Sequence, residues 1–396
     1  MLKLAVSLFI FSFFIGPNAF GATYKLESVN SFRVLNPAFL KITPNNDGLW
    51  IGSFGMLKGD QLRYLPLNGG LQEDLAPEME LISNNVTWPN EIVDAPEETF
   101  GEGYVVVAGG FLVPTKGTGA LNLVHRDYGL VRAISSSKRG WFYHRVIWHD
   151  VDGDGKLDLV AARASKPLFG SKEGELVWFK QPQKPFKDQW IESMLVKGPD
   201  VFFRMGDFDG DGDIDIAAAE FFQERFAVYW GDKRGFRKEV VADDLGPVFD
   251  LVWEDLNGDG SKDFLVTNHV NGPKSGIFVF ERKPTGDWVR RTLLSGLETR
   301  RPGPGQGSPG APKVFFPDPQ QKPLIIVSGD GTEHFYVLQP NSQSTSDWNY
   351  SVLAENMKST VGKLAFSDVD GDGLFELFVP AYDRSEVSIY RLVPAH

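Results

Sequence analysis

Three features of the 396-residue sequence predict an all-β protein, a seven-bladed β-propeller of four-stranded blades. An acidic nine-residue loop recurs four times, a short strand of alternating apolar residues recurs seven times, and one spare strand precedes the repeats. Repeats of this length cannot bury an apolar face alone, so they stack on their neighbours. The chain is therefore expected to form one closed ring of repeats.

The first 22 residues are expected to be a secretory signal peptide outside this ring. The segment MLKLAVSLFIFSFFIGPNAFGA has a lysine near its start, an apolar run from Leu4 to Ile15 and small residues at its end. The apolar run is shorter than the roughly 20 residues that a membrane-spanning helix needs. We therefore expect a secreted protein, extracellular or periplasmic, with no membrane span, in which residues 23–396 form the propeller.

Composition excludes several classes of function. The chain has no cysteine, which excludes thiol catalysis and cysteine-bound zinc and leaves core size or metal to stabilise an exported protein. The net charge of −12 argues against a nucleic-acid partner. Sixteen carboxylates lie in the four loops, and four divalent cations would bring the net charge to −4. Bound ions therefore explain the acidity better than an acidic recognition surface does.

The four acidic loops set the repeat length. They start at Asp150, Asp207, Asp255 and Asp368, at intervals of 57, 48 and 113 residues. The last interval is about twice the others and predicts a degenerate copy, which we place at KVFFPDPQQKPLIIV, residues 313–327. This copy keeps the flanking apolar strands but replaces the acidic loop with Pro-Gln-Gln-Lys. The mean period of 54.5 residues then predicts about seven units.

Seven alternating strands count the units independently. Each has the period-two pattern with Val, Tyr, Phe or Trp that indicates a strand. They are QLRYLPL (61–67), ALNLVHR (120–126), ELVWFKQP (175–182), FAVYWGD (226–232), IFVFERKP (277–284), HFYVLQP (334–340) and VSIYRLVP (387–394).

A further strand follows six of these seven. The six are LQEDLAPEM (71–79), YGLVRAIS (128–135), WIESMLV (190–196), FRKEVVA (236–242), WVRRTLL (288–294) and YSVLAEN (350–356). The seventh has no room for one, whereas YKLESVN, residues 24–30, is a spare strand at the other end. We expect this strand to complete the last blade, because a closed ring leaves no exposed sheet edge. An open solenoid would leave the strand unused.

Each acidic loop offers oxygen ligands for one cation. From Asp150 to Asp158, side chains at positions 1, 3, 5 and 9 and the carbonyl at position 7 can converge, and glycines at positions 4 and 6 permit the turn. Hard oxygen donors favour calcium over zinc, and magnesium would need a stricter octahedron. Asp-Gly turns without metal are disfavoured because clustered carboxylates repel one another.

The helical calcium-binding motif is excluded. That motif needs a glutamate at position 12 and a following helix. Position 12 is instead Ala161, Ala218, Thr267 or Val379, and the sequence continues as a buried strand. We therefore expect about four structural Ca²⁺ ions, each fixing a strand-to-strand turn.

These loops and their spacing resemble the FG-GAP/VCBS repeat family, which includes the propeller of integrin α-subunits. The resemblance is clear in units three, four, five and seven, and units one and two (ITPNNDGLWIG and NEIVDAPEE…YVVVAGG) fit only by register. Asn257 and Glu376 depart from the usual aspartate, so weaker or altered sites are expected there. The resemblance implies side-chain ligands at Asp150, Asp152, Asp154, Asp158, Asp207, Asp209, Asp211, Asp215, Asp255, Asn257, Asp259, Asp263, Asp368, Asp370, Asp372 and Glu376, and carbonyl ligands at Lys156, Asp213, Ser261 and Leu374.

The resemblance also places the calcium loops on one face and a second set of residues around the channel on the opposite face. Five residues before the loop starts stand Arg145, Phe202, Asp250, Lys313 and Lys363. Just after the second strands come Arg163, Glu220, Asn268, His269, Asp330 and Tyr382, and the neighbours are His144, Arg204, Glu333 and His334.

This charged set suits a sugar or a uronate. Cations would hold carboxylates, and aromatic side chains would stack on pyranose faces; the candidates are Tyr143, Trp148, Phe202 and Phe203. For catalysis, a Tyr143, His144 or His269 base with Arg145 or Lys363 neutralising the substrate acid would suit β-elimination. The alternative is that the channel mouth is polar because it is wet.

We therefore expect an exported calcium-binding propeller that recognises a glycan or an extracellular protein through the face opposite its loops. The alternative is a carbohydrate lyase or dehydratase acting on a uronate or keto-sugar, since similar propellers occur in rhamnogalacturonan-type lyases and in aldos-2-ulose dehydratase. A structural module is the third possibility. Fold by itself does not choose among them.

Overall fold

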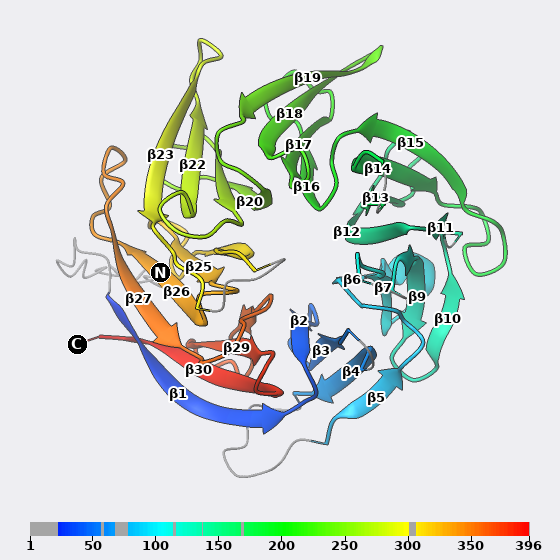
Figure 1. Ribbon diagram of the computed structural model, residues 1–396, viewed down its shortest axis with the longest axis horizontal. Coiled ribbons are helices and arrows are strands. Elements are labelled where there is room, and N and C mark those ends of the chain that lie inside the picture. The colour runs from blue at the N-terminus through cyan, green and yellow to red at the C-terminus, as the bar shows by residue number, and fades with distance from the viewer. Residues whose placement is uncertain are drawn as a thin grey trace, which may run out of the picture.

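The propeller prediction is confirmed by a computed structural model that describes residues 23–56, 59–67, 78–113, 116–136, 138–167, 170–300 and 306–395. The described residues form seven antiparallel sheets arranged as blades around a central axis (Figure 1). Within them the only helix is the four-residue α1 (Glu97–Phe100). No helix among the described residues is long and apolar enough to cross a membrane. The predicted signal peptide lies outside these residues.

Blades one to three follow the chain from the axis outward. Blade one contains β2 (Pro37–Ile42), β3 (Gly48–Ser53), β4 (Gln61–Pro66) and β5 (Glu80–Ser83). Blade two contains β6 (Glu91–Asp94), β7 (Tyr104–Ala108), β9 (Leu121–His125) and β10 (Gly129–Ala133). Blade three contains β12 (Trp141–His149), β13 (Asp158–Ser165), β14 (Glu173–Lys180) and β15 (Ile191–Lys197). The short strand β8 (Thr118–Gly119) pairs with the start of β12, and β11 (Lys138–Arg139) pairs with β8.

Blades four to six repeat the same order. Blade four contains β16 (Phe202–Gly206), β17 (Asp215–Glu220), β18 (Arg225–Asp232) and β19 (Gly235–Ala242). Blade five contains β20 (Val248–Glu254), β21 (Asp263–Asn268), β22 (Gly276–Arg282) and β23 (Trp288–Ser295). Blade six, the predicted degenerate copy, contains β24 (Pro312–Phe315), β25 (Leu324–Ser328), β26 (His334–Pro340) and β27 (Tyr350–Asn356).

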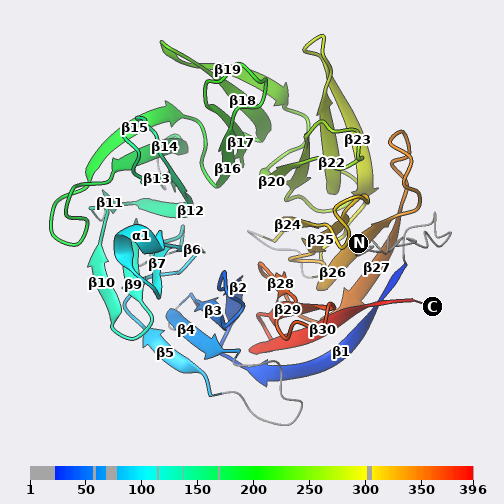
Figure 2. The same ribbon diagram turned by 180° about the vertical axis from the view of Figure 1, so that it is seen from behind.

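Blade seven closes the ring with strands from both ends of the chain (Figure 2). Its order is β28 (Ala365–Ser367), β29 (Phe375–Ala381), β30 (Glu386–Pro394) and β1 (Tyr24–Arg33). The N-terminal strand runs antiparallel to β30 from Tyr24 opposite Pro394 to Arg33 opposite Glu386. The spare strand therefore completes the last blade, as predicted.

One predicted strand is in the wrong place. The outer partner of β4 is β5 (Glu80–Ser83), with Leu62 opposite Ser83, and not the segment 71–79. Residues 71–77 lie outside the described part of the chain. The segment 71–79 contains Pro77, which cannot donate a ladder hydrogen bond, whereas Glu80–Ser83 supplies apolar residues without a proline.

The core lies between the blades. Alternate residues of β17 face opposite neighbours: Ile216 and Ala218 pack in one cluster with residues of blade three, and Ala217 and Ala219 in another with residues of blade five. Every residue of β17 is buried. Burial on both faces explains why the second strands read as continuous apolar runs instead of alternating patterns.

Candidate functional site

The four acidic loops join the first and second strands of blades three, four, five and seven, as predicted. In three of them, one oxygen from each of three carboxylates lies within 4.8 Å of the others. These groups are Asp150, Asp152 and Asp158; Asp207, Asp209 and Asp215; and Asp368, Asp370 and Glu376. A single cation can contact three oxygens at this spacing.

The first aspartate of each loop folds the backbone around itself. Asp207 Oδ1 accepts hydrogen bonds from the Gly210 and Asp211 amides at 2.8 and 3.1 Å, and Oδ2 accepts one from Gly212 at 3.0 Å. Both glycines have positive φ, +80° and +91°, which explains the strict Gly-x-Gly spacing. The predicted carbonyl donors at position 7 are held in register as well, because their amides donate to the position-5 carboxylate: Lys156 to Asp154, Asp213 to Asp211, Ser261 to Asp259 and Leu374 to Asp372.

The ninth residue of each loop has a buried carboxylate. Asp215 accepts amide hydrogen bonds from Phe208 at 2.8 Å and Gly231 at 2.7 Å. In blade five, Asp263 Oδ2 is buried without a hydrogen-bond partner. Burial and the nearby Glu281 carboxylate raise the pKa of Asp263 to about 7. An all-oxygen donor set that includes an orphaned buried carboxylate oxygen fits a bound hard cation.

Blade six has no such cluster among its described residues. Its loop carries a buried ammonium group instead: Lys322 Nζ donates to the Asp347 carbonyl at 2.5 Å. Blade six therefore has a buried protein cation in the loop where blades three, four, five and seven carry their carboxylates.

The region around the central axis, called the channel below, contains one residue from the innermost strand of each blade or from the residues leading into it. Arg145 of blade three reaches Glu91 of blade two, with Nε–Oε2 at 3.3 Å, and Asp250 of blade five, with Nη2–Oδ2 at 3.2 Å. Lys363 of blade seven also ion-pairs with Glu91. Blades three and five are not neighbours, and neither are blades two and seven, so the Arg145–Asp250 and Lys363–Glu91 pairs each reach past the blade that lies between them. The full set is Phe39, Glu91, Arg145, Phe202, Asp250, Lys313 and Lys363.

Two β-bulges direct consecutive side chains into this channel. The register of β12 against β13 shifts between Tyr143 and Val146, and that of β20 against β21 shifts between Val248 and Asp250. His144 consequently lies 5.9 Å from the Phe39 ring and 6.4 Å from the Phe249 ring while the adjacent Arg145 reaches Asp250. Bulges commonly re-aim side chains next to functional sites.

Most of the channel charges compensate one another. Burial alone would raise the pKa of Glu91, but Lys363 and Arg145 hold it at about 2. Burial lowers the pKa of His144 to about 3, so this imidazole is neutral at physiological pH. Burial raises the pKa of Asp250, and Arg145 opposes the shift.

The channel nevertheless contains more basic than acidic side chains. Arg204 lies 3.9 Å from Asp250 and is partly exposed. Lys313 is close enough to Lys363, Glu91 and Arg145 to interact with them electrostatically. The basic residues are Arg145, Arg204, Lys313 and Lys363, and the acidic ones are Glu91 and Asp250. A local positive surplus in a chain of net charge −12 does not follow from composition.

Replacing Lys313 with methionine is expected to change how stability depends on pH. Lys313 is half-buried at the channel wall, where desolvation and the Lys363 ammonium lower its pKa to about 7. Between pH 7 and 10.5 the unfolded chain binds a proton that the folded chain has released, so stability rises with pH in this window. Lys313→Met should raise the melting temperature at pH 7 and flatten that rise. Equal pH slopes in thermal melts of both proteins would contradict the assignment, and the exposed Lys187→Met is the control.

A buried tryptophan and several half-buried aromatic rings lie on the face opposite the acidic loops. The indole of Trp88 stacks between Phe54, at 4.1 Å, and Phe111, at 5.0 Å. Phe54, Phe111, Phe221 and Tyr382 all follow second strands. The sequence contains this signal at Phe54, Phe221 and Tyr382, which directly follow a second strand; the sequence-based prediction named Tyr382 but missed Phe54 and Phe221.

None of the aromatics predicted to stack on a sugar belongs to this half-buried group, and Phe202, although it lies beside Arg145, is inaccessible. Tyr143, Phe202 and Phe203 are fully buried. Trp148 packs against Phe100 and Trp190, near the metal loop of blade three.

Several predicted ligand residues have internal partners. Arg163 donates to Glu175 and Glu192, at 2.6 and 2.7 Å, and to the Tyr143 hydroxyl at 3.0 Å. Three groups surround the buried Glu220, namely Arg225, Lys238 and the Tyr229 hydroxyl. His334 Nδ1 lies 2.7 Å from the Thr332 carbonyl oxygen, and the Tyr382 hydroxyl donates to the Phe54 carbonyl at 3.0 Å.

The structure brings together two residues that the sequence suggested separately. His269 Nε2 lies 2.8 Å from Asp330 Oδ2, although 61 positions separate them. The His269 ring stacks on Phe249 at 5.0 Å and lies 5.8 Å from Phe221. A histidine oriented by a carboxylate and flanked by aromatic rings is an arrangement that can act as a general base.

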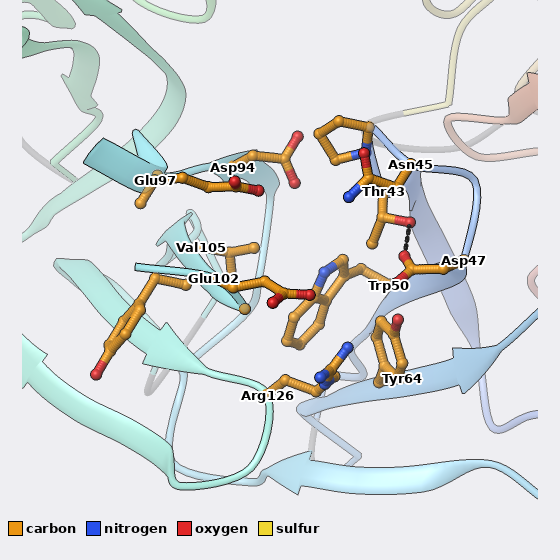
Figure 3. Close-up of a pocket in the computed structure, with 14 residues that line it drawn as sticks. Thr43, Asn45, Asp47, Trp50, Tyr64, Asp94, Glu97, Glu102, Val105 and Arg126 are labelled. Carbon is orange, nitrogen blue, oxygen red and sulfur yellow. Dashed lines mark hydrogen bonds between the residues drawn. The ribbon is translucent and has the colours of Figure 1, made fainter. Parts of the chain in front are cut away.

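A second hollow lies between blades one and two, on the side of the metal loops (Figure 3). Trp50, Tyr64 and Arg126 line it together with four carboxylates, those of Asp47, Asp94, Glu97 and Glu102. Arg126 stacks over the Tyr64 ring at 5.4 Å, and Asp94 is paired with Lys41 at 2.8 Å. Because acids outnumber bases in this hollow, it disfavours anionic ligands.

Comparison with known proteins agrees with the repeat and the fold. The family model of FG-GAP-like repeats matches residues 150–218 and 207–266, which hold the loops of blades three, four and five. No curated protein sequence matches the chain.

Solved structures share the fold at low identity. A candidate 6-phosphogluconolactonase of Bacteroides fragilis is 12% identical with a TM-score of 0.52, over 82% of this chain and 85% of that one. One from Bacteroides uniformis is 13% identical with a TM-score of 0.51, over 81% and 86%. The calcium-binding protein regucalcin of Agrobacterium tumefaciens is 12% identical over 81% and 86%, with a TM-score of 0.43. At these identities the likeness concerns the fold and not the activity.

Proposed function

Because the chain is a β-propeller with FG-GAP-like repeats, we propose that it is an exported calcium-binding recognition module for a carboxylate-bearing carbohydrate. Calcium would be held in the acidic loops and would fix the turns of blades three, four, five and seven. The carbohydrate would be held at the channel mouth on the opposite face. An extracellular protein with an acidic surface is the other partner compatible with that charge.

Calcium is favoured by the donor set. The loops offer carboxylate, amide and carbonyl oxygens and no histidine or cysteine, which suits a hard cation with flexible coordination. The ion would supply the positive charge that neutralises each cluster, while the first aspartate and the two glycines already hold the backbone turn.

The observation that carries the ligand assignment is the positive surplus inside an acidic protein, bordered by half-buried aromatic rings. Arg204 and Lys363 are the more exposed of the ion-paired channel cations and can form charge-assisted hydrogen bonds to a carboxylate. Phe54, Phe221 and Phe249 provide apolar surface next to them. A uronic acid presents both features, a carboxylate and a pyranose ring.

Substituting Arg204 with glutamine is expected to weaken binding of uronate oligosaccharides about tenfold, since a hydrogen bond to a charged group contributes roughly 1.5–3 kcal/mol. Titration calorimetry with oligogalacturonate and with a neutral oligosaccharide of equal length would measure this. Arg204 is partly exposed, so the fold should tolerate the change. Glu102→Gln, in the acidic hollow, is the matched control and should leave the affinity unchanged. If Arg204→Gln and the parent protein bind the oligosaccharide with equal affinity, the binding site does not lie at the channel.

An enzyme is the second candidate, and the His269–Asp330 pair favours it. A base at His269 would remove the proton next to the carboxylate of a uronate, and channel cations would stabilise the developing charge. As the proton is removed, the C–O bond to the leaving sugar breaks, that oxygen departs and takes up a proton, and a C=C bond conjugated with the carboxylate forms, which absorbs ultraviolet light. A rise in absorbance with oligogalacturonate that disappears in His269→Gln would favour the lyase; a constant absorbance with intact binding would favour the recognition module.

A further inference from the structure

The four metal loops differ at one position of the neighbouring strand. The third strand of each blade places a residue opposite the ninth, buried ligand of the loop. Glu376 pairs with Arg391 directly, and the registers of Leu159 with Phe179, Ile216 with Tyr229 and Phe264 with Phe280 fix the other three positions. The residues opposite the ninth ligand are therefore Lys180 in blade three, Trp230 in blade four, Glu281 in blade five and Arg391 in blade seven.

In blades three and seven this residue is a cation that reaches into the loop. Lys180 Nζ ion-pairs with Asp152 and with Asp154, the latter at 3.0 Å. Arg391 lies 2.7 Å from Glu376, 2.9 Å from Asp370 and 3.5 Å from Asp372. Each of these cations thus contacts the same carboxylates that would ligate the metal ion.

In blades four and five the same position supplies no cation. The Trp230 indole donates to Glu239 at 2.6 Å and carries Arg282 over its ring at 4.2 Å. Glu281 is buried, paired with Arg291 at 2.6 Å, and faces the Asp263 carboxylate with like charge. Among the described residues, no lysine or arginine ion-pairs with a loop carboxylate of either blade.

We propose that Lys180 and Arg391 are tethered cations that compete with calcium, so that the propeller has two classes of metal site. This inference rests on the proposed calcium function. The loops of blades three and seven are partly neutralised by the protein, bind calcium more weakly and keep their turns without it. The adjacent loops of blades four and five depend on the ion for neutralisation and bind it more tightly; in blade five the absence of a competing cation outweighs the carboxylate that Asn257 replaces, for which the sequence alone suggested a weaker site.

The physical reason is the electrostatic competition between a fixed charge and a diffusible one. A metal ion entering the loop of blade three must share or displace the ammonium group that contacts Asp152 and Asp154. Its binding free energy is therefore reduced by the ion pair that it disrupts and by repulsion from Lys180. The side chain of Lys180 is 36% exposed, so solvent screens part of this effect.

The test is calcium titration calorimetry of the chelator-treated chain, comparing Lys180→Gln with the parent protein. We expect about fivefold tighter binding at one weak site of Lys180→Gln, the size of an exposed ion pair. Lys187→Gln, an exposed substitution in the same blade, is the control and should leave the isotherm unchanged. An isotherm of Lys180→Gln identical to that of the parent protein would contradict the proposed competition between Lys180 and calcium. A parent protein that binds no calcium would overturn the calcium proposal itself.

Amide hydrogen exchange provides a readout without any substitution. On addition of chelator, exchange should rise at residues 207–215 and 255–263 well before it rises at 150–158 and 368–376. Equal increases in all four loops would contradict two classes of site.

A second exchange experiment compares two variants. In chelator, Lys180→Gln should exchange faster at 150–158 than Lys187→Gln does, a result that does not require calcium binding. Equal exchange of these two variants at 150–158 would contradict the neutralising role of Lys180.

Discussion

Removal of calcium is expected to lower the melting temperature of the protein by about 10 °C. Sixteen carboxylates are gathered in four loops, and in each of three loops three of them lie within 4.8 Å. An ion present at 100 times its Kd stabilises the folded state by about 2.7 kcal/mol, and several such ions add up even in a chain of this size. Thermal melts with excess calcium and with chelator would measure the shift.

The control for this melt is ion identity. Calcium added back after chelation should restore the melting temperature, whereas equimolar magnesium should restore less, because it demands a stricter octahedron at shorter distances. An unchanged melting temperature in chelator would contradict the structural role of the ions, and it would also contradict the proposal of two classes of metal site.

The second large effect is expected in the central channel. Substituting Glu91 with glutamine should lower the free energy of unfolding by about 3–5 kcal/mol, the usual cost of removing one partner from a buried ion pair. Glu91 is the counterion of both Lys363 and Arg145, which the substitution leaves facing one another with Asp250 as the remaining acid. Denaturant unfolding at pH 7 would measure the loss.

The pH dependence distinguishes this cause from a packing defect. The pKa of Glu91 is lowered from 4.5 to about 2 in the folded chain, so its contribution to stability is present above pH 4.5 and is lost as the pH falls toward 2. The difference between Glu91→Gln and the parent should shrink over the same range. Glu27→Gln, which breaks an exposed pair with Lys25, should change stability by less than about 1 kcal/mol at any pH. A constant difference between pH 7 and pH 3 would show that Glu91 acts through packing.

The repeat, most of the strands and the closure of the ring could be predicted from the sequence. Each of these depends on a local pattern: the Asp-x-Asp-Gly-Asp-Gly spacing fixes the loop through hydrogen bonds within six residues, and period-two alternation marks the third and fourth strands. The decayed loop of blade six could be placed because its flanking strands keep their pattern. The outer strand of blade one was misplaced because four residues, Glu80–Ser83, carry too short a pattern to separate from the preceding segment.

The ion-pair partners of the charged side chains could not be predicted from the sequence, because they depend on how the blades pack. Arg145 and Asp250 are 105 residues apart and lie in blades that are not neighbours. Their ion pair depends on the curvature of the ring and on two bulges that no local sequence pattern predicts. The pairing of His269 with Asp330 and of Lys180 with its loop likewise depends on strand register across turns of variable length. Hydrophobic periodicity is a local property of the sequence. The distances between charged side chains that are remote in the sequence are set only when the blades have packed.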